Sequence, residues 1–249
     1  MIIVLIAAYN EELGLSELLP RLPRLVNDHA VEVLVVSDGS TDGTVDVAME
    51  NGCRTIEIED NRGKGAALKT GLEAIRGEAY DVVVLMDADG QHDPAQLPAI
   101  TAEVLSGTAD LVIGSRYKQR SGRGNAPWNR YVVRCATRGL LDVILSAKVT
   151  DPFCGYRAIS PDAARCIRLQ GDRYESELEM LFCAERAGLR VAEIPIPKIY
   201  GPNTSKMAVR HGAVLGRLDV VARYAYTIVR ETALLVSDPI AKRKNTVSR

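Results

Sequence analysis

The sequence has few of the features that mark several common classes of protein. Aromatic residues make up 5% of the 249 residues, which argues against a surface on which the bases of single-stranded nucleic acid stack. The formal net charge is -1, whereas a general binder of polyanions usually carries an excess of basic residues. We therefore expect no nucleic-acid partner.

Cysteine is scarce, and its spacing predicts no special chemistry. The five cysteines contain no CxxC pair and their number is odd, which favours reduced thiols in a cytosolic protein. The three histidines lie far from one another in the sequence. Neither residue type therefore provides the clustered ligands that a zinc site needs.

Long apolar runs are also missing. No basic residue precedes the apolar run at residues 2–8, so this run is a poor signal peptide. It is much shorter than the roughly 20 apolar residues that a membrane-spanning helix needs, and no other segment reaches that length. We predict a cytoplasmic protein that can still lie against a membrane surface.

The sequence does contain ample material for an α/β core. Hydrophobic residues make up 47% of the chain, and its length suits one large domain or one domain with a small appendage. In the first half, short runs rich in valine and isoleucine alternate with helical patterns, which predicts a mostly parallel sheet covered by helices on both faces. The expected strands are residues 2–8, 31–36, 55–58, 82–86 and 111–113, and the expected helices are 11–25, 42–51, 65–75 and 94–105.

The second half of the chain is less regular. Residues 125–146 and 174–187 have helical patterns, whereas 156–159 and 191–196 have the pattern of strands. Residues 205–236 form a long helical pattern with an apolar stripe bordered by arginines, which suits a helix on a membrane surface. The alternatives are packing within the chain and a homo-oligomer interface. We divide the chain into a domain of residues 1–206 and an amphipathic helical segment with a basic tail, 207–249.

Three polar segments follow predicted strands at the edge where open α/β sheets bind ligands. Tyr9-Asn10-Glu11 follows the first strand, Ser37-Asp38-Gly39-Ser40 follows the second, and Asp87-Ala88-Asp89 closes the fourth. In an extended segment, the side chains of Asp87 and Asp89 leave on the same side. They could share Mg²⁺ or Mn²⁺, which would neutralise a departing nucleoside diphosphate, or they could be two turn aspartates.

Two further segments offer contacts to a nucleotide. The Asp38 carboxylate could accept hydrogen bonds from a base or a ribose, or it could belong to the turn before the next helix. The segment Asn61-Arg62-Gly63-Lys64-Gly65 places glycines and Lys64 before a helix, where backbone NH groups bind anions. Its spacing differs from that of a P-loop.

In their order, these motifs resemble the inverting glycosyltransferases of family 2, and among them most the dolichyl- or polyprenyl-phosphate sugar synthases of the dolichol-phosphate mannose synthase type. The resemblance covers about residues 1–206 and implies the GT-A fold, with a mostly parallel, mixed sheet flanked by helices and a C-terminal helical extension. Matching segments further along the chain are Gly114-Ser115-Arg116-Tyr117, Asp151-Pro152-Phe153-Cys154-Gly155-Tyr156-Arg157, Glu175-Ser176-Glu177-Leu178-Glu179, Glu193-Ile194-Pro195-Ile196 and Gly201-Pro202-Asn203-Thr204-Ser205-Lys206.

The resemblance also implies roles for individual residues at the donor end. Tyr9, Glu11 and Asp38 would line a nucleoside pocket. Asp87, Asp89 and Gln91 would organise the metal and the diphosphate. Two departures leave the nucleobase contacts open, because Ala8 stands where the family usually has proline and Ser37 where it often has aspartate. The implied nucleotide-sugar site comprises Ala8, Tyr9, Glu11, Asp38, Lys64, Asp87, Ala88, Asp89 and Gln91.

The chemistry of the acceptor decides what the other end of the site needs. A sugar hydroxyl requires a general base, for which Asp151 or Glu177 are the candidates. A lipid phosphate is already ionised and needs positioning and charge screening instead. The arginines and lysines available for this are Arg116, Arg130, Arg134, Arg157 and Lys206, of which the resemblance favours Arg116, Arg130 and Lys206.

These inferences predict a metal-dependent hexosyltransferase with Asp89, Arg116 and Asp151 as the catalytic candidates. It would move a hexose from a donor of the GDP-mannose or UDP-glucose type to polyprenyl or dolichyl phosphate, at the cytoplasmic face of a membrane. One alternative is a soluble or polysaccharide acceptor. Another is a nucleotidyltransferase, but Tyr9-Asn10-Glu11 is not the glycine-rich, basic loop expected after its first strand.

Overall fold

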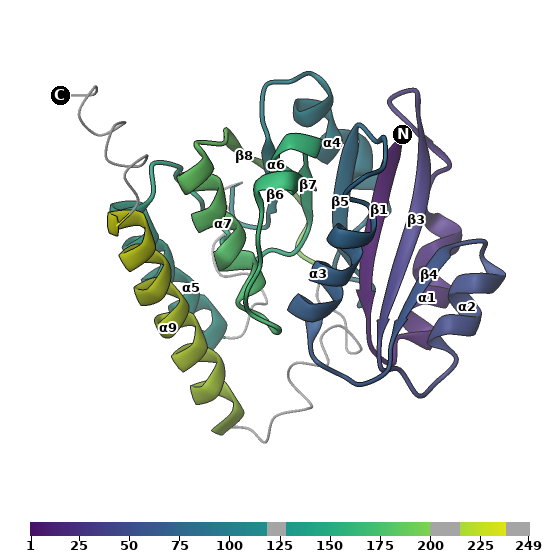
Figure 1. The fold of residues 1–249 in the computed structure, drawn as a ribbon, viewed down its shortest axis with the longest axis horizontal. Helices are drawn as coiled ribbons and strands as arrows, with labels where there is room; N and C mark the ends of the chain where they lie inside the picture. Colours follow the sequence, from purple (N-terminus) through teal and green to yellow (C-terminus); the bar gives the residue numbers. More distant parts are fainter. Residues whose placement is uncertain (119–127, 200–214, 238–249) are drawn as a thin grey trace.

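One mixed sheet organises the part of the chain that the computed structural model describes, residues 1–118, 128–199 and 215–237. Its strands follow the order β2-β3-β1-β5-β7-β6-β8, and β4 also pairs with β3. Helices flank this sheet, and Figure 1 shows α3 (Lys64–Ala74) in front of it and α1 (Glu12–Leu18) behind it. The predicted α/β architecture is therefore confirmed.

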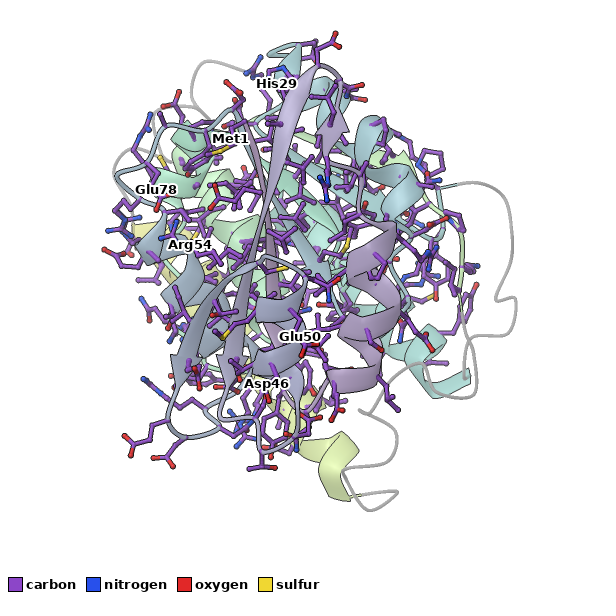
Figure 2. The ribbon with its side chains drawn as sticks, turned by 90° about the vertical axis from the view of Figure 1, so that its right-hand side faces the viewer. Met1, His29, Asp46, Glu50, Arg54 and Glu78 are labelled. Atoms are coloured by element: carbon purple, nitrogen blue, oxygen red, sulfur yellow. The ribbon has the colours of Figure 1, made fainter. Side chains whose placement is uncertain are left out.

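Four strands of the first half are parallel to one another. They are β1 (Ile2–Ala8), β3 (His29–Asp38), β4 (Arg54–Ile58) and β5 (Val82–Asp87). In Figure 2, Met1 and His29 lie at the same end, as expected of two parallel neighbours. Apolar side chains along β1 and β5 are buried because helices cover both faces of a parallel sheet.

The antiparallel strand β7 (Arg157–Ile159) lies between β5 and β6 (Leu111–Ser115) and makes the sheet mixed. Beyond β6, the strand β8 (Val191–Pro195) is parallel to it. Because β7 runs against β5, with Arg157 opposite Leu85, the chain that enters β7 arrives at the end where β5 finishes. Residues that precede β7 are thereby brought to the carboxyl edge of the parallel strands.

The predicted helix at 11–25 is wrong in its second half. The helix α1 ends at Leu18, a 3₁₀ turn η1 (Leu19–Arg21) follows, and the chain then enters the short strand β2 (Leu25–Val26). Pro20 lies at the start of the 3₁₀ turn, where its missing NH costs nothing, but proline does not continue an α-helix. The strand β2 was not predicted, because two residues carry no periodicity.

The remaining helices of the first half lie close to their predicted positions. Residues 42–51 contain α2 (Thr44–Glu50), and 94–105 contain a 3₁₀ turn η2 (Pro94–Gln96) followed by α4 (Leu97–Leu105). The Asp93 side chain caps this segment by accepting a hydrogen bond from the Ala95 NH, as predicted.

The second half adds four helices to the described residues. The predicted α5 (Trp128–Ile144), α7 (Ser176–Ala187) and α9 (Leu215–Ser237) are present, and the short α6 (Pro161–Cys166) was not predicted. Figure 1 shows α9 beside α7 and α5 at one side of the molecule. The proposed boundary after residue 206 lies outside the described residues and stays a prediction. No described helix combines the length and apolarity required to cross a bilayer.

Candidate donor and acceptor site

The polar segments that follow β1, β3 and β5 meet because these strands end in register. Ala7 lies opposite both Val36 and Asp87. The segment after β1 is bound to the turn after β3, since the Asn10 side chain accepts a hydrogen bond from the Thr41 NH at 2.8 Å. A Cβ at Gly14 would lie 2.4 Å from the Ala88 carbonyl oxygen, so α1 also packs tightly against the segment after β5. The predicted donor residues therefore occupy one edge of the sheet.

Asp38 is buried and fixes the loop that precedes α3. One carboxylate oxygen accepts a hydrogen bond from the Arg62 NH at 3.0 Å, and the other accepts one from the Gly63 NH at 2.7 Å. The Asn61 amide also donates to the Asp38 carbonyl oxygen at 3.1 Å. Asp38 therefore has a structural role, but in the loop before α3 and not in the turn before α2. Its contact with a nucleoside stays a prediction.

Lys64 connects the end of β5 to α7. Its Nζ lies 2.6 Å from Asp87 Oδ1 and 2.8 Å from Glu177 Oε1. Burial by itself lowers the pKa of Lys64, but the two carboxylates outweigh burial and raise it above its ordinary value, so the ammonium stays charged. A Cβ at Gly155 would lie 2.6 Å from this Nζ, and so the segment before β7 also closes on the lysine.

The two aspartates of the Asp87-Ala88-Asp89 segment have opposite pKa shifts. Burial raises the pKa of Asp87, but Lys64 and His92 overcome this and lower it to about 2. Burial and the charge of Asp87 raise the pKa of Asp89 to about 6. Gln91 holds Asp89 in place through its backbone NH at 3.1 Å and its side-chain amide at 2.9 Å. Asp89 thus carries a charge that its surroundings only partly neutralise.

His92 supports Asp87, a role that we did not predict from the sequence. Its Nδ1 accepts a hydrogen bond from the Asp87 NH at 2.9 Å, and its ring stacks on Tyr156 with 4.9 Å between the ring centroids. Burial lowers the pKa of His92 to about 4, so the ring is neutral near pH 7 and can accept this bond. Its place five residues after Asp87 was the available signal.

The donor set at the end of β5 fits Mg²⁺ or Mn²⁺. Asp87 and Asp89 offer hard oxygen ligands, and a divalent cation would neutralise the charge that raises the pKa of Asp89. Within the described residues, no group of three or more His, Cys, Asp or Glu side chains is arranged to hold an ion. Asp87 and Asp89 would supply oxygen ligands to such an ion, and phosphate and water would supply others. The Gln91 amide NH₂ donates to Asp89, so ligation by Gln91 stays a prediction.

At the other end of the site, Asp151 binds Arg116 in a two-pronged ion pair. The distances are 2.7 Å from Nε to Oδ2 and 3.0 Å from Nη2 to Oδ1. Asp151 is fully buried, and its backbone NH donates to Glu193 at 3.0 Å. Both carboxylate oxygens of Asp151 therefore orient the guanidinium of Arg116.

Two further cations lie over the ring of Tyr117 within contact distance. The guanidinium carbon of Arg134 lies 3.9 Å from the ring centroid, and Lys198 Nζ lies 4.2 Å from it. Arg134 is buried, and its Nε has no hydrogen-bond partner. Burial, together with Arg134 and Arg116, lowers the pKa of Lys198. Positive charge is thus concentrated beside Asp151.

Comparison with known proteins shows the family to which the chain belongs. Residues 3–168 match the sequence profile of Glycosyl transferase family 2. The chain belongs to this family. It is therefore a glycosyltransferase.

Relatives within family 2 match most of the chain. An undecaprenyl-phosphate mannosyltransferase of Micrococcus luteus is 36% identical over 203 residues, which cover 78% of this chain and 82% of the relative. A polyprenol monophosphomannose synthase of Mycolicibacterium smegmatis is 31% identical over 237 residues, covering 87% and 88%.

A solved structure confirms the GT-A fold expected of the family. The glucosyl-3-phosphoglycerate synthase of Mycobacterium tuberculosis, solved with Mn²⁺, uridine diphosphate and glucosyl-3-phosphoglycerate, superimposes with a TM-score of 0.72. The match covers 94% of this chain and 80% of that one at 23% identity. At this level of identity, the likeness concerns the fold alone.

The structure brings together some of the residues predicted for the acceptor, with one correction. Arg116 and Arg134 lie together, whereas the side chain of Arg130 and all of Lys206 lie outside the described residues. Arg157 is wrong as an acceptor candidate, because it is fully buried and its three nitrogens donate to the carbonyl oxygens of residues 152, 154 and 177. Lys198 was missed. Its place between the matching segments at 193–196 and 201–206 was the only signal.

Proposed function

We propose that this glycosyltransferase moves a hexose, with inversion, from a nucleotide-sugar of the GDP-mannose or UDP-glucose type to polyprenyl or dolichyl phosphate. The observation that carries the proposal is the group of cations beside Asp151, formed by Arg116, Arg134 and Lys198. Such a group suits an acceptor that arrives with negative charge. The names of the Micrococcus and Mycolicibacterium relatives favour a polyprenyl phosphate.

At the donor end, Lys64, Asp87 and Asp89 would hold the diphosphate. A bound Mg²⁺ or Mn²⁺ would supply charge neutralisation of the departing nucleoside diphosphate. Asp87 and Asp89 would hold this ion, and Gln91 and His92 orient the segment that carries them. Lys64 would keep Asp87 in position between nucleotide-binding events through its 2.6 Å contact. Tyr9, Glu11 and Asp38 are the proposed nucleoside contacts.

At the acceptor end, the cations would position the phosphate and screen its charge. A phosphate oxygen is ionised near neutral pH, so no proton has to be removed before it attacks the anomeric carbon. Asp151 is engaged with Arg116 through both oxygens, and Glu177 is engaged with Lys64. We therefore assign Asp151 the task of positioning Arg116, which has the direct role towards the phosphate.

The same glycosyltransferase could instead use a soluble or polysaccharide acceptor, but the surface of α5 and α9 favours a lipid. Large apolar side chains are exposed on both helices, including Val143 at 85% and Val229 at 69%. Figure 1 shows these helices side by side. We propose that they face the cytoplasmic surface of a membrane, where a polyprenyl phosphate is presented.

The test is a donor panel with labelled GDP-mannose and UDP-glucose. Each donor is incubated with polyprenyl phosphate and either Mn²⁺ or Mg²⁺, and the product is extracted into organic solvent. We expect a labelled, metal-dependent glycolipid from one donor. A labelled product found only in the aqueous phase would refute the lipid acceptor, and would leave the soluble-acceptor alternative.

A further inference from the structure

The C-terminal helix α9 contacts two segments that border the proposed donor site. Arg230 forms an ion pair with Glu179 of α7. Tyr224 stacks on Phe153, with 4.6 Å between the ring centroids. Phe153 belongs to the segment that leads to Gly155, which packs against Lys64. The helix that we expected at a membrane surface is thus also part of the packing around the nucleotide-sugar site.

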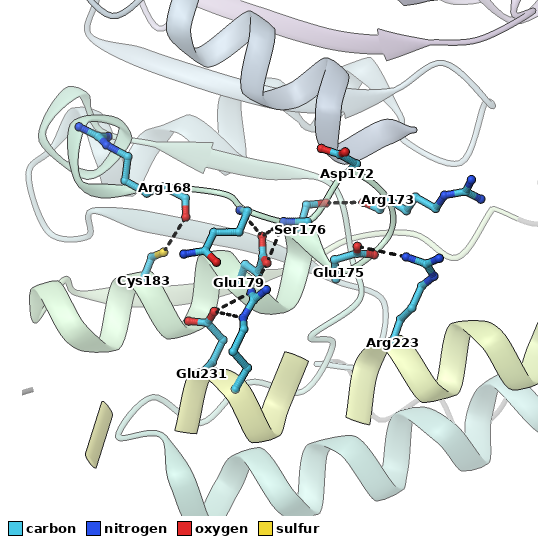
Figure 3. A network of polar contacts seen from close by, with 12 residues as sticks. Arg168, Asp172, Arg173, Glu175, Ser176, Glu179, Cys183, Arg223 and Glu231 are labelled. Carbon is cyan, nitrogen blue, oxygen red and sulfur yellow. Dashed lines mark hydrogen bonds and ion pairs between the residues drawn. The ribbon is translucent and has the colours of Figure 1, made fainter. Parts of the chain in front are cut away.

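The buried carboxylate of Glu179 joins α9 to the loop at residues 170–172. It is 1% exposed and accepts hydrogen bonds from the Gln170 NH at 2.9 Å and the Gly171 NH at 3.0 Å. The same carboxylate receives the guanidinium of Arg230. Figure 3 shows Glu179 between this loop and α9. One side chain therefore connects the loop to the helix, while Lys69 of α3 also contacts the loop at Gln170 and Asp172.

This loop packs directly on the first turn of α3. The Ala66 NH donates to the Asp172 carbonyl oxygen at 3.1 Å. A Cβ at Gly63 would lie 2.4 Å from that oxygen, and a Cβ at Gly65 would lie 2.6 Å from the Gly171 oxygen. The contact leaves no room for a side chain, so a displacement of the loop must also displace the residues on both sides of Lys64.

We propose that Glu179 and Arg230 are positioning residues of the donor site. Through the 170–172 loop, they set the place of Lys64 relative to Asp87. Without Arg230, the buried charge of Glu179 would keep only its two NH donors, and the cost of an unpaired buried charge would favour rearrangement of the loop. The inference rests on the proposed function in one respect, namely that Lys64 and Asp87 hold the diphosphate of the donor.

The experiment compares Arg230→Met with Arg186→Met in the full chain. Both arginines are 23% exposed, both link α7 to α9, and both contact Glu231. Arg186 does not contact the carboxylate of Glu179, which holds the loop. Calorimetric titration with UDP and with GDP, each with Mn²⁺, measures nucleotide binding without lipid. Thermal unfolding measures the stability lost by each variant.

We expect Arg230→Met to raise the dissociation constant of the nucleotide that binds by about 2- to 30-fold. Arg186→Met should lower the melting temperature similarly and leave that constant unchanged, and Arg230→Lys should restore part of the affinity. If Arg230→Met fails to fold, Glu179→Gln serves as the second variant and should also weaken nucleotide binding.

Two outcomes would overturn the inference. The first is a nucleotide dissociation constant for Arg230→Met, or for Glu179→Gln if that variant is used, that equals the wild-type constant. The second is an equal loss of nucleotide affinity in Arg186→Met, which would mean that the Arg230–Glu179 contact contributes only to general stability. Absence of binding of either nucleotide by the wild-type chain would contradict the proposed donor site itself, and the inference with it.

Discussion

The donor end and the acceptor end of the site differ in the sign of the charge that they gather. At the donor end, Lys64 lies between Asp87 and Glu177, and Asp89 stands beside them with a raised pKa. At the acceptor end, burial lowers the pKa of Lys198, and two arginines lower it further while one carboxylate raises it.

Each end is therefore complementary to a different ligand. The carboxylates of the donor end favour a metal cation, whose charge in turn suits a diphosphate. The cations of the acceptor end favour an anion directly. A glycosyl acceptor with a phosphate group satisfies this second requirement, whereas a neutral sugar hydroxyl does not. Variants that remove one charge at a time test this contrast.

The largest effect is expected from removing a donor-end carboxylate. We expect Asp87→Asn and Asp89→Asn each to reduce kcat about 1,000-fold, because the metal loses a charged ligand where the leaving-group charge develops. Transfer assays and Mn²⁺-dependent nucleotide binding measure this. Asp162→Asn is the control, since its carboxylate is exposed and pairs with Arg165 on the surface. A variant that keeps a tenth of the activity would contradict the assignment.

A smaller loss is expected at the acceptor end from Asp151→Asn. This variant leaves Arg116 without its two-pronged partner, and misplacement of the guanidinium should reduce kcat/KM by about 100-fold or less. The KM for polyprenyl phosphate should rise while nucleotide affinity stays the same. A matched control is Asp110→Asn, which removes a similar pair with Arg190 on the surface. A loss of about 10,000-fold in kcat alone would instead indicate a general base.

A still smaller effect is expected from Lys198→Ala. Loss of one charged contact to the acceptor phosphate should raise its KM by about tenfold. The KM for the donor should not change, since Lys198 belongs to the cations around Tyr117 and not to the carboxylates near Lys64. Lys148→Ala provides an exposed lysine as a control. Equal rises in both KM values would remove the distinction between the two ends.

The smallest effect is on stability and follows from the pKa of Asp89. The folded chain raises this pKa from 3.8 to about 6, so the ionised carboxyl destabilises the fold above pH 6, and this penalty disappears as pH falls to about 4. Without metal at pH 7.5, Asp89→Asn should melt about 2–4 °C above the wild type, and the difference should vanish near pH 4. A melting temperature below that of the wild type at pH 7.5 would contradict the unfavourable burial of this charge.

Much of the first half could be predicted from local patterns. Buried runs of valine and isoleucine marked β1 and β5 to within one residue of their observed ends. The strand β2 escaped prediction because it depends on a two-residue turn, in which Asn27 and Asp28 have positive φ angles of 48° and 64°. Such a turn closes the hairpin, but its two residues are not the Asn-Gly pair that usually signals it.

The meeting of the polar segments at the proposed donor end could be predicted because it follows from strand ends, whereas the group of cations at the proposed acceptor end could not be predicted in full. Once β1, β3 and β5 are parallel neighbours, their terminal polar residues must meet. Lys198 joins Arg134 at Tyr117 through segments that are more than sixty residues apart in the chain. No local pattern encodes that meeting.

The sequence by itself determined an α/β chain with Asp87-Ala88-Asp89 at the end of a buried strand, because strand periodicity and strand ends are local properties. The glycosyltransferase assignment came from the resemblance of its motifs, in their order, to family 2. Only the tertiary structure decided that β7 enters the sheet antiparallel, that Arg157 is buried rather than available, and that α9 contacts the loop at α3. These features depend on which distant segments bury their apolar faces together, and local sequence patterns do not specify such long-range packing.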